Sequence, residues 1–182
     1  SHYQIKKGVA CGFLTPQPLE SFQLCVTSAV LMAILLDNGK QWEIVNKEGG
    51  EPITVKDQEK HHTLSIFKCK KVTVVVEGKI NSVSLLDCVD TQVVMNTVIN
   101  TVEVTNCKKV KLQITESCPS AAIDKTDSCM IYLMSEEAKK MQISTSKHSD
   151  TQITFMKGED PVEVPVPEQF VHSLGPDGKL VS

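Results

Sequence analysis

Three consecutive stretches of equal length decide the fold: SIFKCKKVTVVVEGKINSV (65–83), SLLDCVDTQVVMNTVINTV (84–102) and EVTNCKKVKLQITESCPSA (103–121). Each has a cysteine at its fifth position. A chain that repeats at a fixed short period stacks one structural unit per repeat, and neighbouring units share a core that no single unit could form. The sequence therefore predicts a solenoid.

Apolar residues alternate within each repeat, as in a strand with one buried face. Turn-forming Asn, Asp, Gly or Pro separate the alternating runs, and β-branched residues dominate them. Matching apolar columns contain Ile66, Leu85 and Val104; Val74, Val93 and Leu112; Val76, Met95 and Ile114; and Ile80, Ile99 and Cys118. An antiparallel β-sandwich is the alternative, although its strands rarely match column by column. The predicted fold class is all-β, a parallel β-helix.

The period is interrupted after residue 121. Cys129 follows Cys107 by more than one repeat length, which predicts a three-residue insertion within 124–128. Loops on a rigid scaffold are favoured places for binding residues. Further coils are expected around residues 42–44, 53–55, 141–143 and 153–155, giving about six in all.

The two ends of the chain differ from the repeats. Residues 1–36 are expected to form a lead-in or cap, and their apolar run is shorter than the roughly 20 residues of a membrane span. The β-helix is expected over 37–160. In the extension 161–182, prolines leave the strand ladder and the Pro-Asp-Gly run predicts a hairpin. A second copy that exchanges this hairpin would cover the open edge, which predicts a homodimer.

Charge and cysteine content exclude several classes of function. The chain has 19 basic and 22 acidic residues, so a nucleic-acid partner is not expected. Every basic residue is lysine, which rules out chemistry that needs a guanidinium. Seven cysteines cannot all pair, and neither CxxC nor HExxH motifs occur. The expectation is free core thiols in a reducing compartment, with no metal and no cofactor.

Several motifs, in order along the chain, resemble the C-terminal domain of cyclase-associated proteins: GKQWEIVN (39–46), EGKINSV (77–83), AIDKTDSC (122–129), PVPEQF (165–170) and DGKLV (177–181). This resemblance implies a right-handed parallel β-helix that dimerises through a swapped C-terminal hairpin. It implies binding of monomeric actin, a preference for ADP-actin, and either faster nucleotide exchange or monomer sequestration. It implies a non-enzymatic protein that is cytoplasmic and cytoskeleton-associated.

Carried over residue by residue, the resemblance implies actin contacts at Lys79, Asn81, Lys125, Thr126, Asp127 and Lys179. It implies dimer contacts at Pro165, Pro167, Phe170, Leu180 and Val181. Because actin is acidic, lysines would speed encounter and orient docking. Each lysine has the alternative interpretation of a solvated surface charge. Adenylyl cyclase and cofilin-bound actin are further partners in the wider family.

The β-helix fold has three alternative functions. A GTPase-activating β-helix of the tubulin cofactor C type needs an arginine finger, which this chain lacks. A polysaccharide-cleaving β-helix needs converging carboxylates, whereas Asp87, Asp90 and Glu103 are scattered among lysines. A purely structural dimeric β-helix stays open, and it differs from the others in that it would ignore actin.

Overall fold

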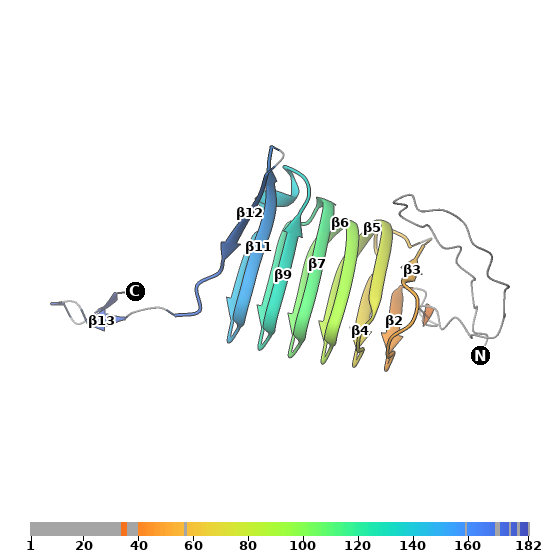
Figure 1. The fold of residues 1–182 in the computed structure, drawn as a ribbon, viewed down its shortest axis with the longest axis horizontal. Coiled ribbons are helices and arrows are strands. Elements are labelled where there is room, and N and C mark those ends of the chain that lie inside the picture. The colour runs from red at the N-terminus through yellow and green to blue at the C-terminus, as the bar shows by residue number, and fades with distance from the viewer. Residues whose placement is uncertain are drawn as a thin grey trace.

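A computed structural model describes residues 34–35, 40–56, 58–158, 160–169, 172–174, 176–177 and 179–181 of the 182-residue chain. The predicted lead-in therefore lies almost entirely outside the described residues. Within them the chain winds through six coils, each adding one strand to each of two parallel sheets (Figure 1). No helix in the described part of the chain is long and apolar enough to cross a membrane.

The first sheet contains β2 (Gln41–Val45), β4 (Thr63–Phe67), the C-terminal parts of β5 (Thr73–Leu86) and β6 (Val89–Thr105), β8 (Ser120–Asp124) and β10 (Gln142–Ser146). The second sheet contains β3 (Ile53–Val55), the N-terminal parts of β5 and β6, β7 (Lys108–Ser117), β9 (Asp127–Leu133) and β11 (Ser149–Lys157). All these pairings are parallel. They confirm the predicted solenoid and exclude the antiparallel sandwich.

Antiparallel pairing occurs only at the ends of the described structure. β1 (Ile34–Leu35) pairs with β2, and β12 (Asp160–Pro165) pairs with β11. β13 (Ser173–Leu174) and β14 (Leu180–Val181) form a small separate hairpin. Figure 1 shows β13 well away from the stacked coils.

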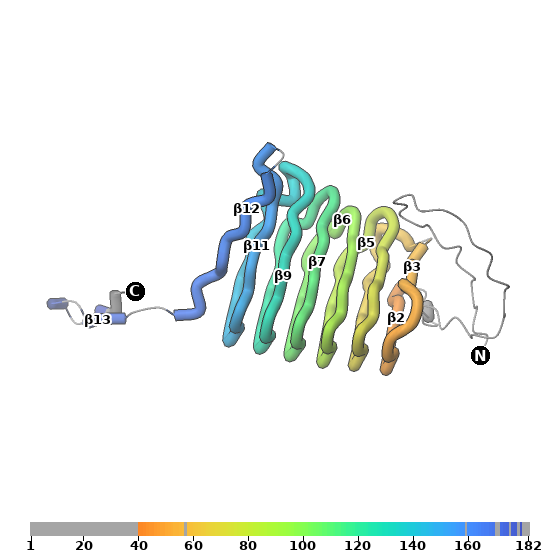
Figure 2. Tube along the Cα trace, viewed as in Figure 1, coloured from red at the N-terminus to blue at the C-terminus, as the bar shows by residue number. Residues whose placement is uncertain are grey.

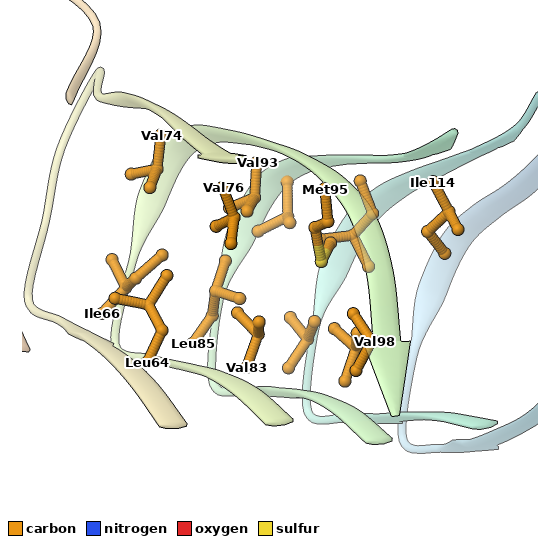
Figure 3. Close-up of a cluster of buried hydrophobic side chains, with 14 of the residues drawn as sticks. Leu64, Ile66, Val74, Val76, Val83, Leu85, Val93, Met95, Val98 and Ile114 are labelled. Carbon is orange, nitrogen blue, oxygen red and sulfur yellow. The ribbon is translucent and has the colours of Figure 1, made fainter. Parts of the chain in front are cut away.

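The core consists of the predicted columns, stacked in register. Ile66 lies opposite Leu85, which lies opposite Val104, and Val74 lies opposite Val93 in the same way. These side chains are at most 1% exposed. Figure 3 shows Ile66, Leu85, Val74 and Val93 pointing inward between the two sheets. Fully burying a Val, Leu or Ile side chain contributes about 1.5–3 kcal/mol. A ladder of this kind makes each coil depend on its neighbours.

Two predictions about register are wrong. Ile80 pairs with Val98 and not with Ile99, because the register between β5 and β6 shifts after Val76; Val98 is 1% exposed and Ile99 is 43% exposed. The expected insertion within 124–128 is also absent, because Val110 lies directly opposite Cys129. The extra residues come later, between β9 and β10, around the short 3-10 helix η1 (Ala138–Lys140).

Candidate functional site

The solenoid has two edges, where the chain passes from one sheet to the other. We call the turns that follow the first-sheet strands the tight corners; they are residues 46–49, 68–71, 87–90, 106–109, 125–128 and 147–150. The bends at which the chain leaves the second-sheet strands are the wide corners; their described residues are 56, 58–62, 77–81, 96–100, 115–119 and 134–141, and the middle three bends lie wholly or partly within β5, β6 and β7. Figure 2 shows the tight corners stacked along the lower edge and the wide corners along the upper edge.

Every tight corner begins and ends with a residue of positive φ. The first positions are Asn46, Lys68, Asp87, Asn106, Lys125 and Lys147, and the last are Gly49, Lys71, Asp90, Lys109, Ser128 and Asp150. In each corner two left-handed residues reverse the chain while the strands on either side keep their parallel register. Asn and Asp adopt the left-handed backbone conformation readily, but for lysine this conformation costs about 1–2 kcal/mol of free energy. Five lysines nevertheless hold such positions.

Lysine dominates the charge of this edge. The tight corners contain Lys47, Lys68, Lys70, Lys71, Lys108, Lys109, Lys125 and Lys147. Their acidic residues are Glu48, Asp87, Asp90, Asp127 and Asp150. The outward positions of the first sheet carry only acidic charges, at Glu43, Glu103 and Asp124. The tight edge is therefore the electropositive ridge of the described coils, and it suits an acidic partner.

Three predicted actin contacts lie in the fifth tight corner. Lys125 is exposed, and its Nζ lies 3.9 Å from the carboxylate of Asp124. Asp127 is exposed and accepts a hydrogen bond from the Ser149 hydroxyl at 2.5 Å. Thr126 is 1% exposed and donates to the carbonyl oxygen of Asp124 at 3.0 Å. Because its side chain faces the core, Thr126 serves the corner itself and is unavailable for direct contact.

Lys79 and Asn81 belong to a wide corner, on the opposite edge. Lys79 is exposed, and the backbone N–H of Asn81 donates to His62 O at 2.8 Å. The nearby charges alternate in sign, since Lys56 pairs with Glu77 at 3.1 Å. The structure thus separates the Lys79 group from the Lys125 group within one chain.

The remaining predicted residues lie in the C-terminal extension. Pro165 ends β12 opposite Gln152, and Pro167 is exposed beyond it. Phe170 lies outside the described residues. Leu180 and Val181 form β14, and Lys179 precedes them with its Nζ 3.4 Å from Asp177. These positions agree with the predicted hairpin, while its exchange between two chains stays a prediction.

Among groups of three or more His, Cys, Asp or Glu residues in the described part of the chain, one cluster has metal-ligand spacing: Glu59, His61 and His62 in the first wide corner. The Nδ1 atom of His62 accepts hydrogen bonds from Trp42 Nε1 at 3.2 Å and from the Glu59 backbone N–H at 3.0 Å. An acceptor at Nδ1 places the ring proton on Nε2, so neither nitrogen of this tautomer offers a lone pair to a metal. His62 instead ties the wide corner to β2 through Trp42.

Sequence reasoning missed the paired left-handed positions of the tight edge. A usable signal was present, because Asn, Asp or Lys stand three residues apart around Cys69, Cys88 and Cys107, and Asn46 and Gly49 have the same spacing. Read with the preference of Asn, Asp and Gly for positive φ, that spacing predicts a repeated corner.

Comparison with known proteins shows the family of the chain. Residues 32–182 match the family described as "Adenylate cyclase associated (CAP) C terminal". The chain belongs to this family. Adenylyl cyclase-associated protein 1 of Bos taurus is 36% identical over 139 residues, which cover 76% of this chain and 29% of the bovine protein. Adenylyl cyclase-associated protein 2 of Rattus norvegicus is 33% identical over 132 residues, covering 72% of this chain and 28% of the rat protein.

A solved structure of a family member has the same fold. The crystal structure of cyclase-associated protein from Cryptosporidium parvum superposes with a TM-score of 0.76 at 29% identity, covering 86% of this chain and 96% of that chain. The chain spans less than a third of the length of the bovine and rat relatives. Family membership therefore describes the matched C-terminal domain.

Proposed function

We propose that this chain binds monomeric actin and regulates actin turnover by binding, without catalysing a reaction. The observation that carries the proposal is membership of the cyclase-associated C-terminal family over residues 32–182. We further propose that it prefers ADP-actin and acts in the cytoplasm beside the cytoskeleton. A protein that binds best to actin with a loosened nucleotide must weaken nucleotide binding reciprocally, so exchange needs no catalytic side chain.

Charge supports the tight edge as the principal actin contact. All of its lysines except Lys47 are exposed, and actin is acidic, so long-range attraction would favour this edge at encounter. Lys125 and Asp127 lie on the ridge, whereas Lys79 and Asn81 would belong to a second contact on the wide edge. Lys179 would contribute from the hairpin.

The C-terminal hairpin supports a homodimer. β13 and β14 contain two residues each, and an isolated two-stranded hairpin of this size is not stable by itself in water. Packing of the hairpin, including Leu180 and Val181, on a second copy would supply the missing contacts. Sedimentation of a chain lacking residues 175–182 tests this: a monomer is expected, and a persisting dimer would remove the exchange. Adenylyl cyclase and cofilin-bound actin are secondary candidate partners.

Release of a fluorescent ATP analogue from monomeric actin tests the function. Faster release at substoichiometric protein is the expected result for an exchange factor. Slower release at stoichiometric protein would assign sequestration instead. No effect on release and no binding at any concentration would leave a purely structural β-helix and overturn the proposal.

Charge reversal on the two edges tests the contact. Lys125→Glu is expected to weaken actin binding about tenfold, since a contact charge is reversed within an electropositive ridge. Lys79→Glu changes another exposed lysine, on the wide edge; it is the matched control and is expected to have a smaller effect. Larger loss with Lys79→Glu would move the contact to the wide edge, and unchanged affinity in both variants would remove both assignments while actin binding itself stands.

A further inference from the structure

Three cysteines form a column just inside the tight edge. Cys69, Cys88 and Cys107 occupy the second position of successive tight corners and are 0–1% exposed. The residues that follow them are paired across the coils: Lys70 lies opposite Val89, and Val89 opposite Lys108. The cysteines are therefore stacked in register, about 4.8 Å apart from one coil to the next.

Cys88 and Cys107 are in direct polar contact. The backbone N–H of Cys88 donates to Cys107 Sγ at 3.4 Å, and Cys107 Sγ lies 3.2 Å from the carbonyl oxygen of Thr105. A hydrogen bond between the two thiols lowers the pKa of Cys107 and raises the pKa of Cys88 to about 11. Cys69 holds its proton more firmly, because its hydrogen bond to Cys88 and its burial raise its pKa.

The spacing suits a bridging ion better than a disulfide. A disulfide requires Cβ atoms about 3.8 Å apart and sulfurs about 2.05 Å apart, which is shorter than the ~4.8 Å rise between coils. For scale, two collinear bonds of the zinc–thiolate length, about 2.3 Å, span ~4.6 Å, and the slightly shorter bonds of Cu(I) to thiolate would need only a small approach of the two sulfurs from that rise. Thiolates are the ligands that soft monovalent copper prefers.

We propose that Cys88 and Cys107 bind one Cu(I) ion between adjacent coils, in two-coordinate thiolate geometry. Two S–H bonds break, two Cu–S bonds form, and two protons leave to solvent, so the copper stays Cu(I) and no electron is transferred. The bound unit carries one negative charge. This site is independent of the proposed actin binding.

The surroundings allow an ion to enter and its charge to be balanced. The chain neighbours Val89, Asn106 and Lys108 are exposed, so the thiols lie one residue layer beneath the surface. Lys108 and Lys70 flank the pair and oppose the negative charge of the copper bis-thiolate. Asp87 is the acidic residue next to the pair, and its carboxylate already accepts a hydrogen bond from Asn106 Nδ2 at 2.5 Å.

The column itself supplies the test variant. Thr126 occupies the equivalent position in the fifth coil and is buried there, so this corner accepts threonine. Cys88→Thr removes the middle thiol and leaves Cys69 and Cys107 about 9.6 Å apart, two coils away from each other and too far to share an ion. Cys129→Val is the control, because Cys129 lies opposite Val110 and is buried without a thiol neighbour in its column.

The experiment uses the full chain with Cys11→Ser and Cys25→Ser, so that the remaining thiols are the three of the column and the buried Cys118 and Cys129. Cu(I) is supplied anaerobically as its acetonitrile complex and competed with bicinchoninate, while thiolate-to-copper absorption is followed in the ultraviolet. One Cu(I) per chain is expected, with at least 100-fold weaker binding for Cys88→Thr and unchanged binding for Cys129→Val. Cys88→Ala replaces the threonine variant if circular dichroism shows that Cys88→Thr does not fold. No binding by the parent chain, or binding by a folded Cys88 variant as tight as that of the parent chain, would overturn the site.

Discussion

The tight and wide edges make the same crossing between sheets in different ways. At the tight edge all six corners have four residues, two of them left-handed, and a small side chain such as Cys88 or Thr126 fills the interior. At the wide edge the corners differ in length, the register shifts near Gly78, and one corner includes η1. The tight edge keeps the same geometry in every coil, whereas the differences in length and register between coils occur at the wide edge.

The difference follows from strand geometry. Side chains alternate between faces along a strand, so one added residue turns every later side chain to the wrong face unless a turn corrects it. A tight corner has no spare residue to make that correction. A wide corner already contains register shifts, and its residues Ile99 and Asn100 face solvent.

Inserting one glycine on each edge gives the largest expected contrast. Placed between Cys88 and Val89, it should lower the free energy of unfolding by more than about 4 kcal/mol, because the inward columns of the adjoining strand lose their register. Placed between Ile99 and Asn100, it should cost about 1 kcal/mol, because both residues are exposed in a wide corner of β6 that already contains a register shift. Urea unfolding at 25 °C measures both. Equal losses would show that the two edges constrain the fold equally.

The same contrast explains what could be predicted from sequence. Columns such as Ile66, Leu85 and Val104 were predictable because alternation and a fixed period repeat the same burial in every coil. Val98 was not, because a register shift decides which of two adjacent apolar residues turns inward, and that shift depends on pairing with another coil. From sequence alone, Cys129 was placed in the column of Cys69, Cys88 and Cys107 because it is also a cysteine. In the structure Thr126 occupies that column and Cys129 lies opposite Val110.

The candidate site was predictable only as separate motifs. Lys79 and Lys125 were both identified as surface lysines, and both are exposed. Their opposite placement depends on which half of the coil contains each corner, and neither residue type nor period specifies this. The lysine ridge emerges only when the tight corners of distant repeats are stacked.

Alkaline titration of two buried thiols, one beside each edge, sharpens the comparison. Burial raises the pKa of Cys129, just after a tight corner, to about 12. Burial also raises the pKa of Cys118, in a wide corner, but hydrogen bonds with the backbone of Ser120 and Val102 oppose the rise. Because the folded state holds the Cys129 proton more tightly than the unfolded chain, its contribution to stability is complete below the unfolded pKa and is lost as pH rises towards 12.

Cys129→Val should therefore remove about 1 kcal/mol per pH unit of the decline in stability between roughly pH 10 and 11. Valine is the matched replacement, since Val110 lies opposite in the same column. Cys118→Val should reduce the decline in stability with rising pH by less than Cys129→Val does. Urea unfolding across this pH range measures how steeply the free energy of unfolding falls with pH in each variant. A larger change for Cys118→Val would show that the thiol beside the wide edge is the more strongly desolvated of the two.

Relief of backbone strain is the smallest expected effect and isolates the left-handed positions themselves. Lys109 has φ 54°, while its neighbour Lys108 begins β7 and is not among the positive-φ residues. Lys109→Asn should raise the free energy of unfolding by about 0.5 kcal/mol, since asparagine accepts positive φ more readily than lysine. Lys108→Asn removes the same charge from the same ridge but places asparagine at a strand position, where it is disfavoured. Thermal and urea unfolding should therefore move the two variants in opposite directions, and equal stabilisation of both would assign the effect to charge repulsion along the ridge instead of to the backbone.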